Sequence, residues 1–266
     1  MKKILLPLLL MIPFDSFTQN TKKHTFQYND TANKWKAGEL SFEFNGQDYD
    51  AIVVNPARQK IRMHWLSKEN IPYKNINAIK QFLQKKKEDV LMITNGGMYL
   101  KNNIPVGLFV SEGKELRPID TMGNKDGNFY IQPNGVFFLD KTGSGYILTT
   151  NSFIDSANHK KFKINYATQS GPMLVVNRSI NASFTPQSKN INLRSGVGIL
   201  PNGYIVFVIS RSDKTNFFDF ASIFKNKFDC SNALYLDGAI SKMYLKTLRQ
   251  KDLGGDFGTM ISVTNN

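Results

Sequence analysis

The strongest candidate for chemistry is an aspartate that ends a short apolar segment, Asn232 to Ser241, with the sequence NALYLDGAIS. Apolar runs of this length are typical of a strand covered on both faces, and a carboxylate at the end of such a strand is costly unless water or a ligand reaches it. We therefore expect Asp237 at an open edge of a sheet. Taken alone, the pair Asp237-Gly238 favours an ordinary tight turn instead.

A second segment repeats this organisation earlier in the chain. Residues 76–84 place apolar side chains at helical spacing and lead into VLMITNGG at 90–97, as the apolar positions of 217–228 lead into the strand of Asp237. If both strands share one sheet and one direction, Asn95 and Asp237 lie at the same edge, where ligands of α/β sheets usually bind. Chance similarity between two short strands is the alternative.

Other loops also carry residue types that approach ligands. Consecutive glycines bring backbone amides close to an anion, and hydroxyl and amide side chains beside a glycine or proline turn can orient a substrate. These loops are Asn95-Gly96-Gly97, Gln169-Ser170-Gly171-Pro172, Arg194-Ser195-Gly196 and Ser210-Arg211-Ser212. Each is also typical of an ordinary turn.

The elements that must position these residues are mostly strands. Runs at 39–45, 49–55 and 60–66, separated by turn residues, predict a β-meander. Two amphipathic helices are predicted at 76–84 and 217–228, the second capped by Thr215 or Asn216. The remaining strands are predicted at 90–94, 107–110, 127–131, 135–139, 146–149, 172–176, 196–200, 204–209 and 258–263. The pattern predicts an α+β fold, a strand-rich mixed sheet with two main helices in a single compact domain.

The first residues are typical of a secretory signal peptide. Two lysines precede an apolar run at 4–14, which is shorter than the ~20 residues that span a bilayer, and no later segment reaches that length. We expect a signal peptide at 1–19, a polar segment at 20–36, and one domain at 37–266 in a periplasmic or secreted protein. Cys230 is the only cysteine, so the core alone must hold the fold.

The charge balance predicts an anionic partner. The chain has 34 lysines and arginines against 21 acidic residues. In an exported protein this excess favours anionic glycans or phosphorylated envelope polymers rather than nucleic acid.

Six segments, in this order, resemble those of the phosphodiester glycosidase family. They are NGGMY, PVGLFVSEGKELRPID, GNFYIQPNGVFFLD, ATQSGPMLVVN, NLRSGVGI and NALYLDGAIS, within residues 51–263. The resemblance is greatest to small bacterial exported members. It implies hydrolysis of the bond between a sugar's anomeric carbon and a phosphodiester, and it reverses the preference for an ordinary turn at Asp237.

The resemblance also implies roles for individual residues. Asp237 is expected to act as base or nucleophile towards the anomeric carbon, and Arg194 as a clamp on the phosphate. The amides of glycines and several polar side chains are expected to bind substrate. These are Asn95, Gly96, Gly97, Gln169, Ser170, Gly171, Ser210, Gly238 and Ser241. No cofactor and no metal are implied, and Ala239 stands where the family often has a second glycine.

Three alternatives stay open from the sequence. A non-catalytic module that binds anionic glycans would use the same basic surface. A serine hydrolase would pair Ser170 or Ser195 with a histidine, but the GxSxG pattern is absent. Asp237 and Asp213 would suit a hard cation through oxygen ligands.

Overall fold

The computed structural model describes residues 35–123 and 125–266. The expected signal peptide and nearly all of the polar segment lie outside the described residues. Within the described part, no helix is long and apolar enough to cross a membrane.

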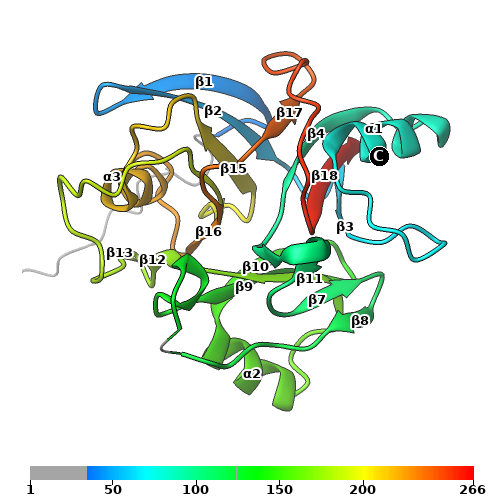
Figure 1. Ribbon diagram of the computed structural model, residues 1–266, viewed down its shortest axis with the longest axis horizontal. Coiled ribbons are helices and arrows are strands. Elements are labelled where there is room, and N and C mark those ends of the chain that lie inside the picture. The colour runs from blue at the N-terminus through cyan, green and yellow to red at the C-terminus, as the bar shows by residue number, and fades with distance from the viewer. Residues whose placement is uncertain (1–34, 124) are drawn as a thin grey trace, which may run out of the picture. The chain divides into compact units, whose positions relative to one another are not determined.

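The strands form three main sheets, and every pairing between the described strands is antiparallel (Figure 1). The seven-stranded sheet has the order β1(Gly38–Phe44), β2(Gln47–Val54), β15(Ile205–Ser210), β14(Ser195–Ile199), β16(Ala233–Asp237), β12(Met173–Val176), β13(Ser179–Ile180). The five-stranded sheet has the order β10(Gly145–Thr149), β9(Gly135–Asp140), β11(Ile164–Ser170), β7(Phe109–Ser111), β8(Lys114–Arg117). The four-stranded sheet has the order β17(Met243–Leu245), β4(Val90–Asn95), β18(Met260–Asn265), β3(Gln59–His64), and β5(Tyr99–Leu100) pairs with β6(Ile104–Pro105).

In the part of the chain that the structure describes, three α-helices begin at side-chain caps. They are α1(Ile76–Lys85), α2(Thr150–Asn158) and α3(Phe217–Ser222), and α3 continues into a π-helical turn, Ile223–Lys227. The preceding residues Asn75, Thr149 and Asn216 each accept a hydrogen bond from a backbone N–H of the first turn. Such bonds satisfy donors that the helix itself leaves unpaired.

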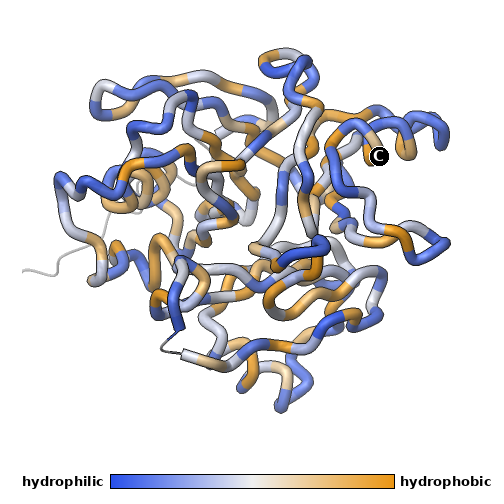
Figure 2. Tube along the Cα trace, in the orientation of Figure 1, coloured by the Kyte–Doolittle hydropathy of each residue, from blue (hydrophilic) through white to orange (hydrophobic). Residues whose placement is uncertain are grey.

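The three sheets share one apolar core, and each sheet packs its other face against its own helix. Strand β2 shows how alternation produces this: Ile52 and Val54 belong to the shared core, while Ala51 and Val53 pack in the cluster that includes α3. Helix α1 covers the four-stranded sheet and α2 the five-stranded sheet. Figure 2 shows the corresponding pattern, with hydrophobic strands inside and mainly hydrophilic loops at the periphery.

The α+β class and both expected helices are confirmed. The single mixed sheet is replaced by three antiparallel sheets, and the expected meander is wrong because β3 pairs with β18 instead of β2. Residues 127–131 contain a 3₁₀ helix, Asn128–Tyr130, where a strand was expected, and Phe129 is its buried residue. Helix α2 was not predicted; Phe153 is its only buried apolar residue, so it lacks a marked apolar stripe.

Candidate active site

Asp237 ends β16, a central strand of the seven-stranded sheet. In the strand register, Ser195 of β14 lies opposite Asp237, and the pairing shifts between Ser195 and Gly196 so that Leu236 is left over. Such bulges bend a strand and often lie beside active sites. The register therefore sets Asp237 at the end of the sheet, as expected from the sequence.

The carboxyl group of Asp237 has few polar neighbours. It accepts a hydrogen bond of 2.7 Å from the N–H of Gly238, and among the described residues it forms no ion pair. Burial disfavours its charged form and raises its pKa to about 6, which the bond from Gly238 only partly opposes. A carboxyl group with this pKa exchanges a proton readily near neutral pH.

Asn95 ends β4, in a different sheet from Asp237, yet its side chain reaches the same edge. Its Nδ2 donates to Ser195 Oγ at 3.4 Å, and its Oδ1 accepts from the backbone N–H of Lys242 at 2.9 Å. The Ser195 and Ser241 hydroxyls are 2.9 Å apart. The expected single sheet for Asn95 and Asp237 is wrong, because β4 and β16 lie in different sheets; Asn95 instead contacts Ser195, the register partner of Asp237.

A third sheet contributes Ser170, at the end of β11. Its hydroxyl donates to the carbonyl of Leu236 at 3.0 Å and is fully buried. Ser170 thus holds the backbone just before Asp237. Strand ends from all three sheets therefore meet around this carboxyl group.

Arg194 is also close, but not as expected. Its side chain is fully buried, with Nε donating to Thr215 O at 2.7 Å and Nη2 to Asn190 O at 2.6 Å. The guanidinium stacks on Phe217, with 3.7 Å between its carbon and the ring centre, and Nη1 donates to the Tyr235 hydroxyl at 3.4 Å. The expectation of a phosphate clamp is wrong for this structure, because the donors bind protein atoms and no face is open to a ligand.

The glycines after Asn95 serve packing. The N–H of Gly96 donates to Thr259 O at 2.8 Å, and that of Gly97 to Thr168 Oγ1 at 3.3 Å. A Cβ on Gly97 would lie 2.3 Å from the carbonyl oxygen of Gln169. Both amides are therefore used inside the protein, and the glycines allow three strands to approach one another.

The remaining expected substrate contacts are also engaged internally. Gln169 accepts from the N–H of Leu108 and of Asp120 and donates to the Asp120 carbonyl, so its amide is a structural bridge. A Cβ on Gly171 would meet a carbonyl at 2.5 Å, and Ser210 accepts from the N–H of Arg194. These residues support the site from within.

A cleft of about 640 Å³ lies beside the loop that follows Asp237, and Ile240 and Lys242 of that loop are in its wall. Tyr99 and Ile240 line it, together with Leu100, Lys101, Asn102, Asn103, Lys242, Gly255, Asp256 and Phe257. The Tyr99 hydroxyl donates to the Asp256 carbonyl, and burial together with the charges of Asp237 and Asp256 raises the pKa of Tyr99 to about 12. Asp237 itself is not a lining residue of the cleft; it precedes the lining residues Ile240 and Lys242 in the same loop.

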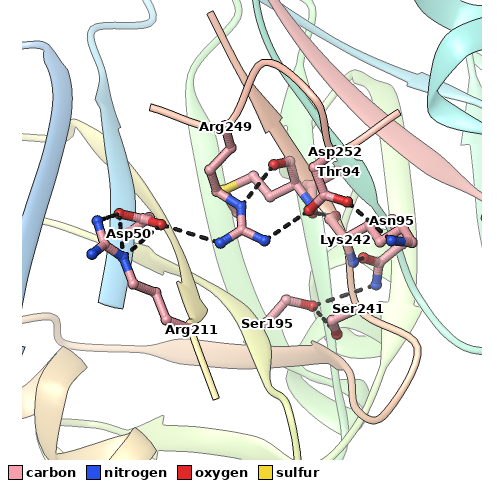
Figure 3. A network of polar contacts seen from close by, with 10 residues as sticks. Asp50, Thr94, Asn95, Ser195, Arg211, Ser241, Lys242, Arg249 and Asp252 are labelled. Carbon is pink, nitrogen blue, oxygen red and sulfur yellow. Dashed lines mark hydrogen bonds and ion pairs between the residues drawn. The ribbon is translucent and has the colours of Figure 1, made fainter. Parts of the chain in front are cut away.

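A chain of charged groups reaches Lys242, on the wall of the cleft (Figure 3). Asp252 accepts from Lys242 Nζ at 3.1 Å and from Arg249 at 2.8 Å, and Arg249 also donates to Asp50 at 3.1 Å. Arg211 completes the chain with a 2.7 Å bond to Asp50. No pattern in the sequence marked Lys242 or Asp252; Asn95 and Thr94, which hold the backbone of Lys242, are almost 150 residues away along the chain.

The described residues do not support the serine-hydrolase or the metal-site alternative. His64 Nε2 lies 2.8 Å from the buried hydroxyl of Ser262, and burial lowers its pKa to about 3. Ser170 and Ser195 bond elsewhere, as described above. Asp213 is exposed, and the described residues contain no group of three or more acidic, histidine or cysteine side chains that could hold a metal ion.

Comparison with known proteins agrees with the sequence resemblance. The family model described as phosphodiester glycosidase matches residues 88–264. An uncharacterized Escherichia coli protein, YigE, is 35% identical over 215 residues, which are 80% of each chain.

Two solved structures share the fold at low sequence identity. The zebrafish N-acetylglucosamine-1-phosphodiester alpha-N-acetylglucosaminidase catalytic domain, auto-inhibited by its pro-peptide, has a TM-score of 0.59 at 14% identity, covering 87% of this chain and 83% of that one. A hypothetical protein from Synechocystis has a TM-score of 0.52 at 13% identity, covering 86% of this chain and 61% of that one.

Proposed function

Since the chain belongs to the phosphodiester glycosidase family, we propose that it hydrolyses the bond between the anomeric carbon of a sugar and a phosphodiester. Water adds its hydroxyl to the anomeric carbon, and the bond from that carbon to the phosphate oxygen breaks. The electron pair stays on the oxygen, which leaves as a phosphomonoester. Because the second pKa of such a phosphate is ~6, the leaving group needs little help from an acid.

The observation that carries this proposal is the half-buried carboxyl group of Asp237 at the end of β16, just before the loop whose Ile240 and Lys242 line the cleft. With its pKa raised to about 6, it is ionised above that pH yet still basic enough to accept a proton. Asp237 either takes the proton of the attacking water or attacks the anomeric carbon itself. The anomer first released, observed by proton NMR, distinguishes inversion from retention.

The proposed substrates are phosphorylated glycans or envelope polymers. The apolar run at 4–14 supports export, and the 34 basic against 21 acidic residues favour anionic polymers. The site also combines Tyr99 with lysines in one cleft, which suits a ligand that has both a sugar ring and a charge.

The test uses methyl and benzyl phosphodiesters of common pyranosyl 1-phosphates. Release of free sugar and phosphomonoester is followed by phosphorus NMR for the wild type and for Asp237→Asn. We expect Asp237→Asn to lose at least about a hundredfold in kcat. Asp213→Asn, an exposed aspartate outside the cleft, is the matched control and should keep full activity. Equal turnover by wild type and Asp237→Asn removes Asp237 from the reaction.

The second candidate is a module that binds anionic glycans without hydrolysing them. The basic surface supports it as well as it supports the enzyme. If no substrate in the panel is turned over while the wild type still binds phosphorylated glycans, this second function is favoured.

A further inference from the structure

Lys242 is held at three points on the wall of the cleft. Its N–H donates to Asn95 Oδ1 at 2.9 Å, its carbonyl accepts from Thr94 Oγ1 at 2.9 Å, and its Nζ lies 3.1 Å from Asp252 Oδ1. A lysine on a surface loop ordinarily samples many rotamers, and a ligand that fixes one of them must offset the lost conformational entropy. The contacts of Lys242 with Asn95, Thr94 and Asp252 already restrict its conformations, so less entropy is lost when a ligand binds.

The charges behind Lys242 do not cancel. The chain described above contains three cations, Lys242, Arg249 and Arg211, and two carboxylates, Asp50 and Asp252 (Figure 3). Hydrogen bonds from the cations offset burial and lower the pKa of both carboxyl groups, so both are ionised. Within these five side chains one positive charge is left in excess, although Asp48 opposes the charge of Arg211 at the far end of the chain.

The excess charge is accessible to a ligand at Lys242. The carboxylates are nearly buried, with side-chain exposures of 3% for Asp50 and 12% for Asp252, whereas that of Lys242 is 42%. The other exposed cation, Arg211, is at the opposite end of the chain of contacts and does not line the cleft. Asp256, the acid on the cleft wall, has one oxygen occupied by the amide of Asn103 at 2.9 Å.

We propose that Lys242 binds the phosphate oxygens of the ligand, with Asn95, Thr94 and Asp252 as its positioning residues. The proposal rests on the proposed function for its substrate and supplies the phosphate contact that buried Arg194 cannot make. A phosphomonoester carries up to twice the charge of a diester, so the phosphate product binds this site more tightly than the substrate does.

The first test measures binding of ligands that have no sugar. Methyl phosphate and inorganic phosphate are titrated calorimetrically into the wild type, Lys242→Met and Lys242→Arg. We expect Lys242→Met to weaken binding at least about fivefold, and Lys242→Arg to stay within about threefold of wild type. Lys246→Met is the matched control, because Lys246 is similarly exposed and also paired with an aspartate, Asp89, but lies outside the cleft.

A second test uses the wild type alone and so does not depend on the folding of a variant. Pyridoxal phosphate forms an imine with a lysine near an anion site, and borohydride reduces that imine to a stable amine. We expect Lys242 to be labelled, and methyl phosphate to protect it, while labelling of Lys246 is unchanged by methyl phosphate.

Three results overturn the proposal: unchanged phosphate affinity in Lys242→Met, an equal loss in Lys246→Met, or labelling of Lys242 that phosphate does not reduce. Failure of the proposed function has a different signature. In that case phosphate binding still depends on Lys242, but no phosphodiester is hydrolysed.

Discussion

Arg194 and Tyr235 are joined by a hydrogen bond of 3.4 Å beneath the turn that follows Asp237. The Tyr235 hydroxyl also lies 2.4 Å from the position that a Cβ on Gly238 would occupy. A buried cation is therefore connected through one hydroxyl to the backbone that holds the candidate catalytic carboxyl group. This relationship links Arg194 to the candidate site although its own donors bind protein atoms.

The first prediction concerns Arg194→Met. The substitution leaves the buried carbonyls of Thr215 and Asn190 without their donors, while it removes the cost of burying a charge. We expect the free energy of unfolding in urea to fall by about 2–4 kcal/mol. Arg178→Met removes an exposed pair with Asp229 and should change it by less than about 0.5 kcal/mol. If Arg194→Met instead kept full stability and raised the KM, Arg194 would again be assigned to binding the phosphate.

The second prediction concerns Gly238→Ala. The new methyl group collides with the Tyr235 hydroxyl, which Arg194 holds in place, so we expect a loss of about 1–3 kcal/mol in stability. Tyr235→Phe removes the colliding oxygen, and the double variant should recover about 1 kcal/mol relative to additivity. Gly123→Ala is the control, since its Cβ would meet no atom within 4 Å. Strict additivity in the double-mutant cycle would contradict the contact.

The third prediction is a pH profile. If Asp237 acts as an ionised base or nucleophile, kcat/KM rises with pH through an apparent pKa near 6. The groups that face this carboxyl group are Tyr99 and Tyr235, whose own pKa values are raised by burial, so neither titrates in the same range. A profile that falls as pH rises through 6 would assign Asp237 the role of an acid.

The fourth prediction is the pH dependence of stability in Asp237→Asn. In wild type the folded state raises the pKa of Asp237 from about 3.8 to about 6, so it favours the protonated form. Stability contributed by that form is present below about pH 4 and is lost as pH rises through 6. Asp237→Asn should therefore exceed wild type by about 2 kcal/mol above pH 7, and by little at pH 4.

Urea midpoints from pH 4 to 8 measure this difference, with Asp213→Asn as the exposed control. A constant difference across the range would mean that the folded protein does not shift the pKa of Asp237.

Local sequence patterns were sufficient for many of the strands, for α1 and α3, and for Asp237 at the end of a buried run, but they missed β8, β11 and β17 and placed a strand wrongly at 127–131. The similar helix-strand units pointed to Asn95 near the strand end of Asp237, although through one shared sheet and not through two. What the patterns could not supply was the pairing of strands. Pairing of β3 with β18 depends on residues about 200 positions apart, and no local signal specifies it.

The roles of polar residues were harder to predict than their positions. Residue types that often bind ligands are used here inside the protein. The side chains of Gln169 and Arg194 donate to backbone carbonyls, and the N–H of Gly97 donates to the Thr168 hydroxyl. Burial distinguishes the two uses, and burial of a loop residue depends on the whole fold. Lys242 illustrates the converse, since its position is set by Asn95, 147 residues away in the chain.

The sharing of one core by three sheets has a consequence for the order of events in folding. Strand β2 pairs with β15, and β3 pairs with β18, so neither sheet is complete until residues near the carboxyl end are available. Such long-range closure is intrinsically slow. During synthesis on the ribosome the β1–β2 hairpin and β3 would therefore wait for their later partners, and the candidate site would form only after most of the chain has emerged.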